Sequence, residues 1–101
     1  MAEAAITQPI QGDVFTAGTS VLPAYTASDR ASRSEPEKIV FQNLHASGVV
    51  TVGGSDAGDE VNGVVLATQY ESVTLHLTDP GVKVYLYSDT ASTPVGVTRV
   101  G

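Results

Sequence analysis

The clearest alternation of apolar and polar residues lies in segment 71–77 (ESVTLHL). Val73, Leu75 and Leu77 fall on one face of an extended chain, and His76 falls on the other. This period of two residues is typical of a β-strand with one buried face. We therefore expect a strand here whose valine and two leucines face the core.

Segment 82–87 (VKVYLY) repeats the alternation. Its two valines and its leucine are expected to face inward, and Tyr85 and Tyr87 outward. Segment 79–81 (DPG) lies before it, with proline and glycine in the order that a β-turn requires. The pattern therefore predicts two strands joined by a short turn.

The first third of the chain is less regular. One strand is expected within 14–24, and the polar stretch 27–37 (ASDRASRSEPE) predicts a loop. Residues 1–13 show neither periodicity nor clustered charge. They are either a frayed terminus or an extended arm that becomes ordered on a neighbouring molecule. In the second case Ile6 and Ile10 would be its anchors.

The remaining β-strands are predicted from short apolar runs. In the last of them Val95 and Val97 are expected to face inward and Arg99 outward. Asn62 and Gly63 stand together between apolar residues, which is a strong indication of a hairpin turn. The runs that predict these strands are 38–43, 49–53, 64–66 and 95–100.

This layout predicts an all-β protein. No gap between the predicted strands is long enough for a crossover helix, so the strands must pair antiparallel. About seven short strands with turns every 8–12 residues are typical of a small β-sandwich or barrel. We expect two parts, the N-terminal arm (1–13) and one β-sandwich domain (14–101).

Composition narrows the class of protein further. Val, Thr and Ile make up 29 of the 101 residues, and β-branched side chains favour strands. The net charge of −6 argues against general nucleic-acid binding, which needs a basic surface. The absence of Cys excludes disulfides, iron–sulfur clusters and thiol nucleophiles. No apolar run is long enough to span a membrane, and no basic start of a secretory signal is visible.

Catalytic residues do not group into any motif. His45 lies in a predicted turn and His76 on the polar face of a strand, so both are expected to be ordinary solvent-facing histidines. A serine, a histidine and an aspartate can be combined, but no motif surrounds them. Zinc-protease and phosphate-binding motifs are absent. We therefore expect no enzyme activity, no catalytic residues and no cofactor.

One cluster of acidic and amide side chains could in principle hold a hard cation. Asp56, Asp59, Glu60 and Asn62 lie close together in a Gly-rich segment, and Ca²⁺ prefers several oxygen ligands from a flexible loop. Their spacing does not match the EF-hand loop, which favours the simpler interpretation of a solvated connection. We therefore predict no metal site.

The two outward tyrosines have two interpretations. Exposed aromatic side chains on a sheet face are typical of a contact surface. Alternatively, loops pack over this strand and cover both rings. Tyr85 and Tyr87 have only Lys83 as a basic neighbour in this strand, so they do not form a platform for single-stranded nucleic acid.

The order of strands and turns from residue 38 to the end resembles that of small β-sandwich virion proteins of tailed bacteriophages. The resemblance covers residues 38–101 and departs from the family in the acidic loop 55–60. It rests on the strand and turn segments 39–43, 49–54, 62–66, 71–75 and 82–87, and on the final Val-rich strand.

This resemblance implies a capsid decoration or cement protein. Such a protein would bind the lattice of the major capsid protein on the virion surface, as a homo-oligomer and through many repeated contacts. The arm would lie on a neighbour or on the shell, and Arg30 and Arg33 would suit an acidic capsid surface. Two alternatives stay open: another virion component (tail, head–tail adaptor or fibre), or a carbohydrate- or cell-surface-binding module in which Tyr85 and Tyr87 stack on sugar rings.

Overall fold

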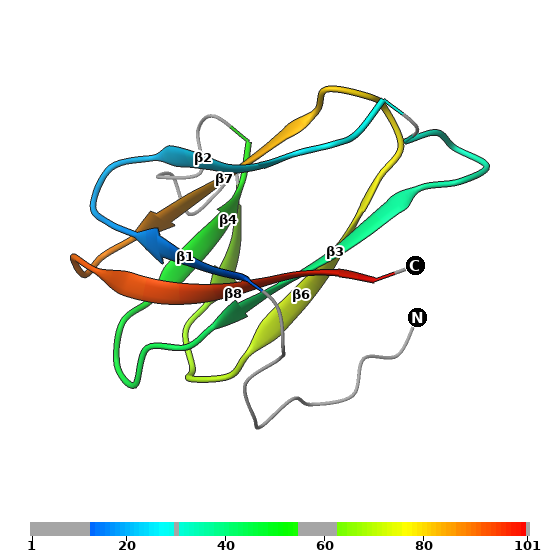
Figure 1. Ribbon diagram of the computed structural model, residues 1–101. Coiled ribbons are helices and arrows are strands. Elements are labelled where there is room, and N and C mark those ends of the chain that lie inside the picture. Colours follow the sequence, from blue (N-terminus) through cyan, green and yellow to red (C-terminus); the bar gives the residue numbers. More distant parts are fainter. Residues whose placement is uncertain (1–12, 30, 55–62, 101) are drawn as a thin grey trace.

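The computed structural model describes residues 13–29, 31–54 and 63–100. These residues form eight β-strands, and no helix occurs among them (Figure 1). The all-β prediction is therefore confirmed. The strands are β1 (Asp13–Ala17), β2 (Leu22–Thr26), β3 (Glu37–Asn43), β4 (Val50–Gly53), β5 (Gly63–Leu66), β6 (Ser72–Leu77), β7 (Lys83–Ser88) and β8 (Thr93–Val100).

The strands pair antiparallel in two four-stranded sheets. Sheet A has the order β1-β8-β3-β6, and sheet B has the order β2-β7-β4-β5. The pairs β1–β8, β2–β7, β3–β6 and β4–β5 are nested inside one another along the chain. This arrangement, in which one long hairpin folds over into two sheets, is the jelly roll form of the β-sandwich. A closed barrel, the other expected form, is not what the chain adopts.

The core lies between the two sheets. Alternate residues of each strand face it, as the period of two requires. In β3 the side chains of Ile39 and Phe41 are fully buried, and in β7 that of Leu86 is fully buried. The other large apolar side chains with almost no exposed surface are Val50, Val52, Leu66 and Val95.

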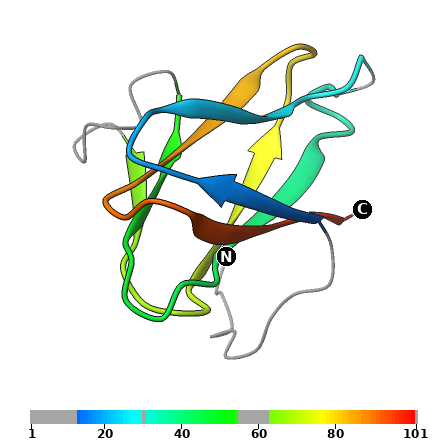
Figure 2. The ribbon, with the colours of Figure 1, turned by 60° about the vertical axis from the view of Figure 1, so that its left-hand side comes forward.

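The N-terminal third contains two strands where we predicted one. β1 and β2 belong to different sheets (Figure 2), because Gly18-Thr19-Ser20 interrupts the chain between them. The break lets Phe15 of β1 pack on the core from sheet A and Tyr25 of β2 from sheet B.

Two turn predictions have different outcomes. The turn at 79–81 is present, and Gly81 has the positive φ of 78° that favours glycine at this position. It connects β6 of sheet A with β7 of sheet B. The predicted Asn62-Gly63 turn is wrong, because Gly63 already pairs with Gly53 inside the β4–β5 hairpin. The connection of that hairpin therefore runs from residue 54 to 62.

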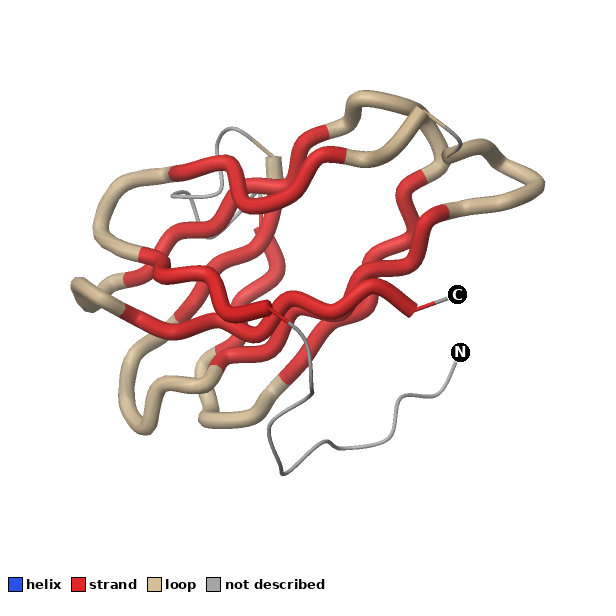
Figure 3. The backbone as a smooth tube through the Cα atoms, viewed as in Figure 1, coloured by secondary structure: helices blue, strands red, loops and turns tan. Residues whose placement is uncertain are grey.

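The loops gather at two ends of the sandwich (Figure 3). At one end the β2–β3 and β6–β7 loops meet, where the Ala27 N–H donates to the Val82 carbonyl at 2.8 Å. At the opposite end the β3–β4 and β7–β8 loops meet, where the Asp89 N–H donates to the Val49 carbonyl at 3.2 Å.

Val82 precedes β7 and is 41% exposed, so its predicted inward position is wrong.

Candidate contact face

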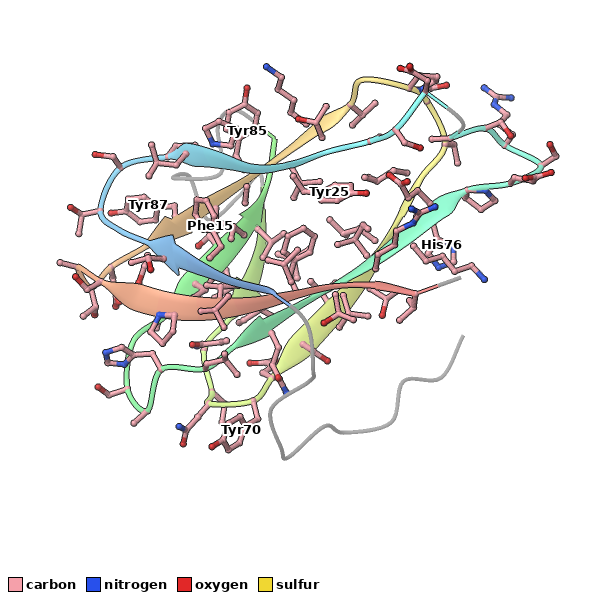
Figure 4. The ribbon with its side chains drawn as sticks, in the orientation of Figure 1. Phe15, Tyr25, Tyr70, His76, Tyr85 and Tyr87 are labelled. Carbon is pink, nitrogen blue, oxygen red and sulfur yellow. The ribbon has the colours of Figure 1, made fainter. Side chains whose placement is uncertain are left out.

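Tyr85 and Tyr87 lie on the outer face of sheet B (Figure 4). The alternate residues of β7, Val84, Leu86 and Ser88, are all buried in the core. The tyrosines therefore face away from it, as the alternation predicted, and both are partly exposed. They lie two residues apart on one strand, which separates their Cα atoms by about 7 Å.

The cross-strand neighbours of these tyrosines are small or uncharged, and the charged neighbour on their own strand is Lys83. Tyr85 lies opposite Pro23 on one side and Gly53 on the other. Tyr87 lies opposite Thr51, and Thr51 lies opposite Val65 on the next strand. We call this surface the tyrosine face; it consists of Pro23, Thr51, Gly53, Val65, Tyr85 and Tyr87, of which Thr51 is itself buried.

Most charged residues of the described chain lie at one end of the sandwich, whereas Asp89, directly after β7, lies at the other. Lys83 is the first residue of β7, beside Thr26 and next to the loop that follows β6. On sheet A, Lys38 and His76 lie opposite each other near the same end. We call it the charged end. Its charged residues, among those described, are Asp29, Arg33, Glu35, Glu37, Lys38, Asp79, Lys83 and Arg99.

The other predicted contact residues have different positions. Arg33 is exposed in the β2–β3 loop at the charged end. Ile6, Ile10 and Arg30 lie outside the described residues, as does most of the predicted arm. β1 begins at Asp13, the last residue assigned to that arm.

A buried carboxylate at the charged end was missed by sequence reasoning. Glu37, expected in a loop, is the first residue of β3, and its side chain is 2% exposed. Its Oε1 accepts hydrogen bonds from the Tyr25 hydroxyl at 2.7 Å and from the Ser28 N–H at 3.0 Å. Tyr25 belongs to sheet B and Glu37 to sheet A, so the carboxylate connects the two sheets.

These contacts change the acidity of both groups. The Tyr25 hydroxyl and then the Ser28 N–H hold the pKa of Glu37 below its ordinary value. Burial, and then the bond to Glu37, raise the pKa of Tyr25 to about 12. Arg99 contributes the smallest effect on the Glu37 pKa; its Nε is 3.6 Å from Glu37 Oε2, but 61% of its side chain is exposed.

The outward prediction for Arg99 is wrong. Arg99 pairs with Ile39, a core residue of β3, and so lies on the inward side of β8. Val95 and Val97 share this side. A charged side chain can occupy the inward side here because Arg99 lies at the end of the sheet. Its guanidinium group is near Glu37, and most of its side chain stays in solvent.

His45 has a structural role that the sequence did not indicate. Its Nδ1 accepts hydrogen bonds from the N–H groups of Ser47 at 3.0 Å and Gly48 at 2.7 Å. A Cβ on Gly48 would lie 3.1 Å from the His45 ring, so glycine permits this close approach. The prediction of an ordinary solvent-facing residue is therefore wrong for His45, whereas His76 is exposed on β6 as expected.

The β3–β4 loop is also held by groups from its neighbours. Asn43 is fully buried, and its Nδ2 donates to the carbonyls of Gly48 at 2.8 Å and Leu66 at 2.9 Å. Asp89 Oδ1 accepts from the Val49 N–H at 3.0 Å, and this bond is the largest cause of the lowered pKa of Asp89. The loop end opposite the charged end is therefore built from satisfied polar contacts.

The predicted acidic cluster of Asp56, Asp59, Glu60 and Asn62 lies outside the described residues. Within 13–29, 31–54 and 63–100, no three histidine or acidic side chains are placed to hold a metal ion. In the same ranges no helix has the length and apolar character needed to cross a bilayer. Comparison of the chain with protein-family models, curated proteins and solved structures found no match in any of the three.

Proposed function

We propose that this chain is a non-enzymatic structural protein of a phage virion that decorates the outer capsid surface. The observation that carries the proposal is the tyrosine face, whose six described residues are uncharged and include two neighbouring, partly exposed tyrosines, Tyr85 and Tyr87. The partner is a lattice of the major capsid protein, and the location is the virion surface.

The chemistry of the tyrosine face suits a protein partner. The cores of protein interfaces are depleted of charged residues and enriched in tyrosine. A tyrosine has only two side-chain torsions to fix, so ordering Tyr85 and Tyr87 costs little entropy. A weak contact of this kind becomes effective when the symmetry of a shell repeats it many times.

The class of partner comes from the resemblance to small virion β-sandwich proteins, which the jelly roll arrangement accommodates. A fold alone does not specify a function, so the tyrosine face supplies the argument for contact. Arg33, exposed at the charged end, adds a planar group that binds carboxylates of an acidic shell.

The first measurement is the copy number of the protein in purified particles of the virus that encodes it. Hundreds of copies are expected for a decoration protein. Twelve or fewer copies would indicate an adaptor or tail component, and absence from the particles would refute the proposal.

The second measurement adds purified protein to capsids that lack it. The double variant Tyr85→Ser/Tyr87→Ser is expected to bind about 1,000-fold more weakly, because two interface tyrosines that contribute about 2 kcal/mol each would remove about 4 kcal/mol. Val14→Ser is the matched control: it removes a 62% exposed apolar side chain from sheet A. Equal binding of the two variants would contradict a role for the tyrosine face.

A carbohydrate-binding module is the second candidate, and one observation favours it. Tyr85 lies opposite Gly53, which has no side chain, and both tyrosines are partly exposed, so they offer an aromatic surface on which a sugar ring could stack. A glycan array, run with and without Ca²⁺, tests this function. Binding that is lost in Tyr85→Ser/Tyr87→Ser would support it, and an empty array would remove it.

A further inference from the structure

We infer that the free edge of β6 pairs with β6 of a second copy of this chain and joins two copies of sheet A into one continuous sheet. β6 is the last strand in the order β1-β8-β3-β6, so one side of its backbone meets no strand of the described chain. This inference is independent of the capsid proposal, since it concerns only contacts between identical chains.

Of the four edge strands in the described part of the chain, β6 is the one whose own residues carry no protection against pairing. Proteins protect exposed edges with short strands, charges, prolines or bulges. β1 carries Asp13, β2 carries Pro23 and a shift of register, and β5 has four residues that begin at Gly63. β6 is the longest of the four, with six residues (SVTLHL) that include no proline, glycine, lysine, arginine or acidic residue.

The hydrogen bonds of sheet A determine which backbone groups face this edge. The Asn43 N–H donates to the Glu71 carbonyl at 3.0 Å. Bonded and non-bonded pairs alternate in an antiparallel ladder, so every second residue after Glu71 also bonds to β3. These residues are Val73, Leu75 and Leu77, which face the core. The N–H and C=O groups of Ser72, Thr74 and His76 therefore point away from β3, toward the free edge.

These groups permit one twofold register with full overlap. A twofold axis perpendicular to the sheet keeps inner faces together, so residues of like orientation must oppose each other. With the axis at Thr74, Thr74 opposes Thr74 of the second copy, and Ser72 opposes His76 of the second copy. The three pairs exchange about six hydrogen bonds. An axis at any other residue of β6 would leave at least one of these three residues without a partner on the facing β6.

The side chains in this register are complementary as well. Val73 and Leu75 lie on the inner face, and both are partly buried against the core. Val73 of each copy would oppose Leu75 of the other copy. These contacts cover apolar surface at the edge of both cores. No like charges meet, because His76 opposes a serine.

Single cysteines provide a direct test, since the chain has none of its own. Residues in a hydrogen-bonded antiparallel pair have Cα atoms about 5.5 Å apart, within the range of a disulfide. Thr74→Cys should give a covalent dimer on mild oxidation. Thr16→Cys is the matched control, because Thr16 is an outward threonine on β1, the other edge of sheet A. Equal crosslinking of both variants, or none at Thr74→Cys, would overturn the inference.

Proline variants test the non-covalent pairing. Thr74→Pro removes an N–H that points to the free edge, so the monomer loses no ladder bond. We expect sedimentation velocity to show a concentration-dependent dimer for the wild type and a dissociation constant raised about tenfold or more by Thr74→Pro. Thr16→Pro, the same change on β1, should leave the dimer unchanged. A wild type that is monomeric at all concentrations, or a dimer that Thr74→Pro does not weaken, would contradict the inference.

This test is separate from that of the capsid proposal. The dimer should persist in Tyr85→Ser/Tyr87→Ser, because the tyrosine face belongs to sheet B and β6 to sheet A. A loss of the dimer in that double variant would place the interface on sheet B and overturn the assignment to β6.

Discussion

Glu37 shows how one residue connects the two sheets of the sandwich. Its carboxylate is buried, yet it keeps its charge because the Tyr25 hydroxyl and the Ser28 N–H both donate to it. A buried charge with two such donors is stabilised only in the folded chain. The stability of the protein must therefore depend on pH through both Glu37 and Tyr25.

The pH dependence has a defined sign at each end. The folded pKa of Tyr25, about 12, is above its ordinary value of 10.0, so its contribution to stability is complete below pH 10 and is lost as the pH rises through 12. The folded pKa of Glu37 is lowered; its contribution is complete above its ordinary pKa of 4.5 and is lost as the pH falls through the folded value.

Tyr25→Phe tests the alkaline half of this argument. The variant should be less stable than the wild type at neutral pH, and the difference in urea midpoint should shrink between pH 10 and 12. Tyr85→Phe is the control, because no hydrogen bond joins its hydroxyl to the described part of the chain. A difference between Tyr25→Phe and wild type that stays constant up to pH 12 would contradict the assignment.

Residue positions were predictable where alternation alone determines them. Tyr85 and Tyr87 face outward because their neighbours on β7 are core residues. The contact between Tyr25 and Glu37 had no local signal, because it joins two sheets whose packing the sequence does not display. His45 was missed for a related reason: its role depends on the conformation of its own loop.

At the scale of elements, the difference between local sequence patterns and contacts between distant segments explains which strands the sequence predicted. β6 and β7 have regular alternation, and their existence was predicted from it, whereas β8 was predicted from a Val-rich apolar run. β1 and β2 have five residues each and too few alternating positions to define a face. Residues 18–20 interrupt the chain between them, and pairing with β8 and with β7 places them in different sheets.

The position of a strand within its sheet determines what a core mutation costs. Leu86 lies on the inner strand β7 and is fully buried, so Leu86→Ala should cost about 2–5 kcal/mol. Leu75 faces the same core, but from the edge strand β6, where it is only partly buried. Leu75→Ala should therefore cost less than half as much. Urea unfolding measures both changes, at a concentration where the protein is monomeric, and equal costs would contradict this assignment of burial.

At the scale of the whole molecule, the nested pairing joins the two ends of the described chain. β1 pairs with β8 across nearly the whole length of the sequence, from Asp13 opposite Val97 to Ala17 opposite Thr93. Such non-local pairs require a long loop to close before they form, which slows folding. The sandwich is therefore complete only when its first strand is in place.

Two truncations separate the predicted arm from the first strand. Removal of residues 1–12 should leave the fold intact, because all eight strands remain, and should weaken capsid attachment if the arm lies on the shell. Removal of residues 1–17 also deletes β1, with the partly buried Phe15 and the fully buried Ala17. That loss should cost at least about 3 kcal/mol, from apolar burial and from the ladder with β8. Urea unfolding gives both values, and a chain without residues 1–17 that is as stable as the full chain would show that β1 contributes nothing to closing the sandwich.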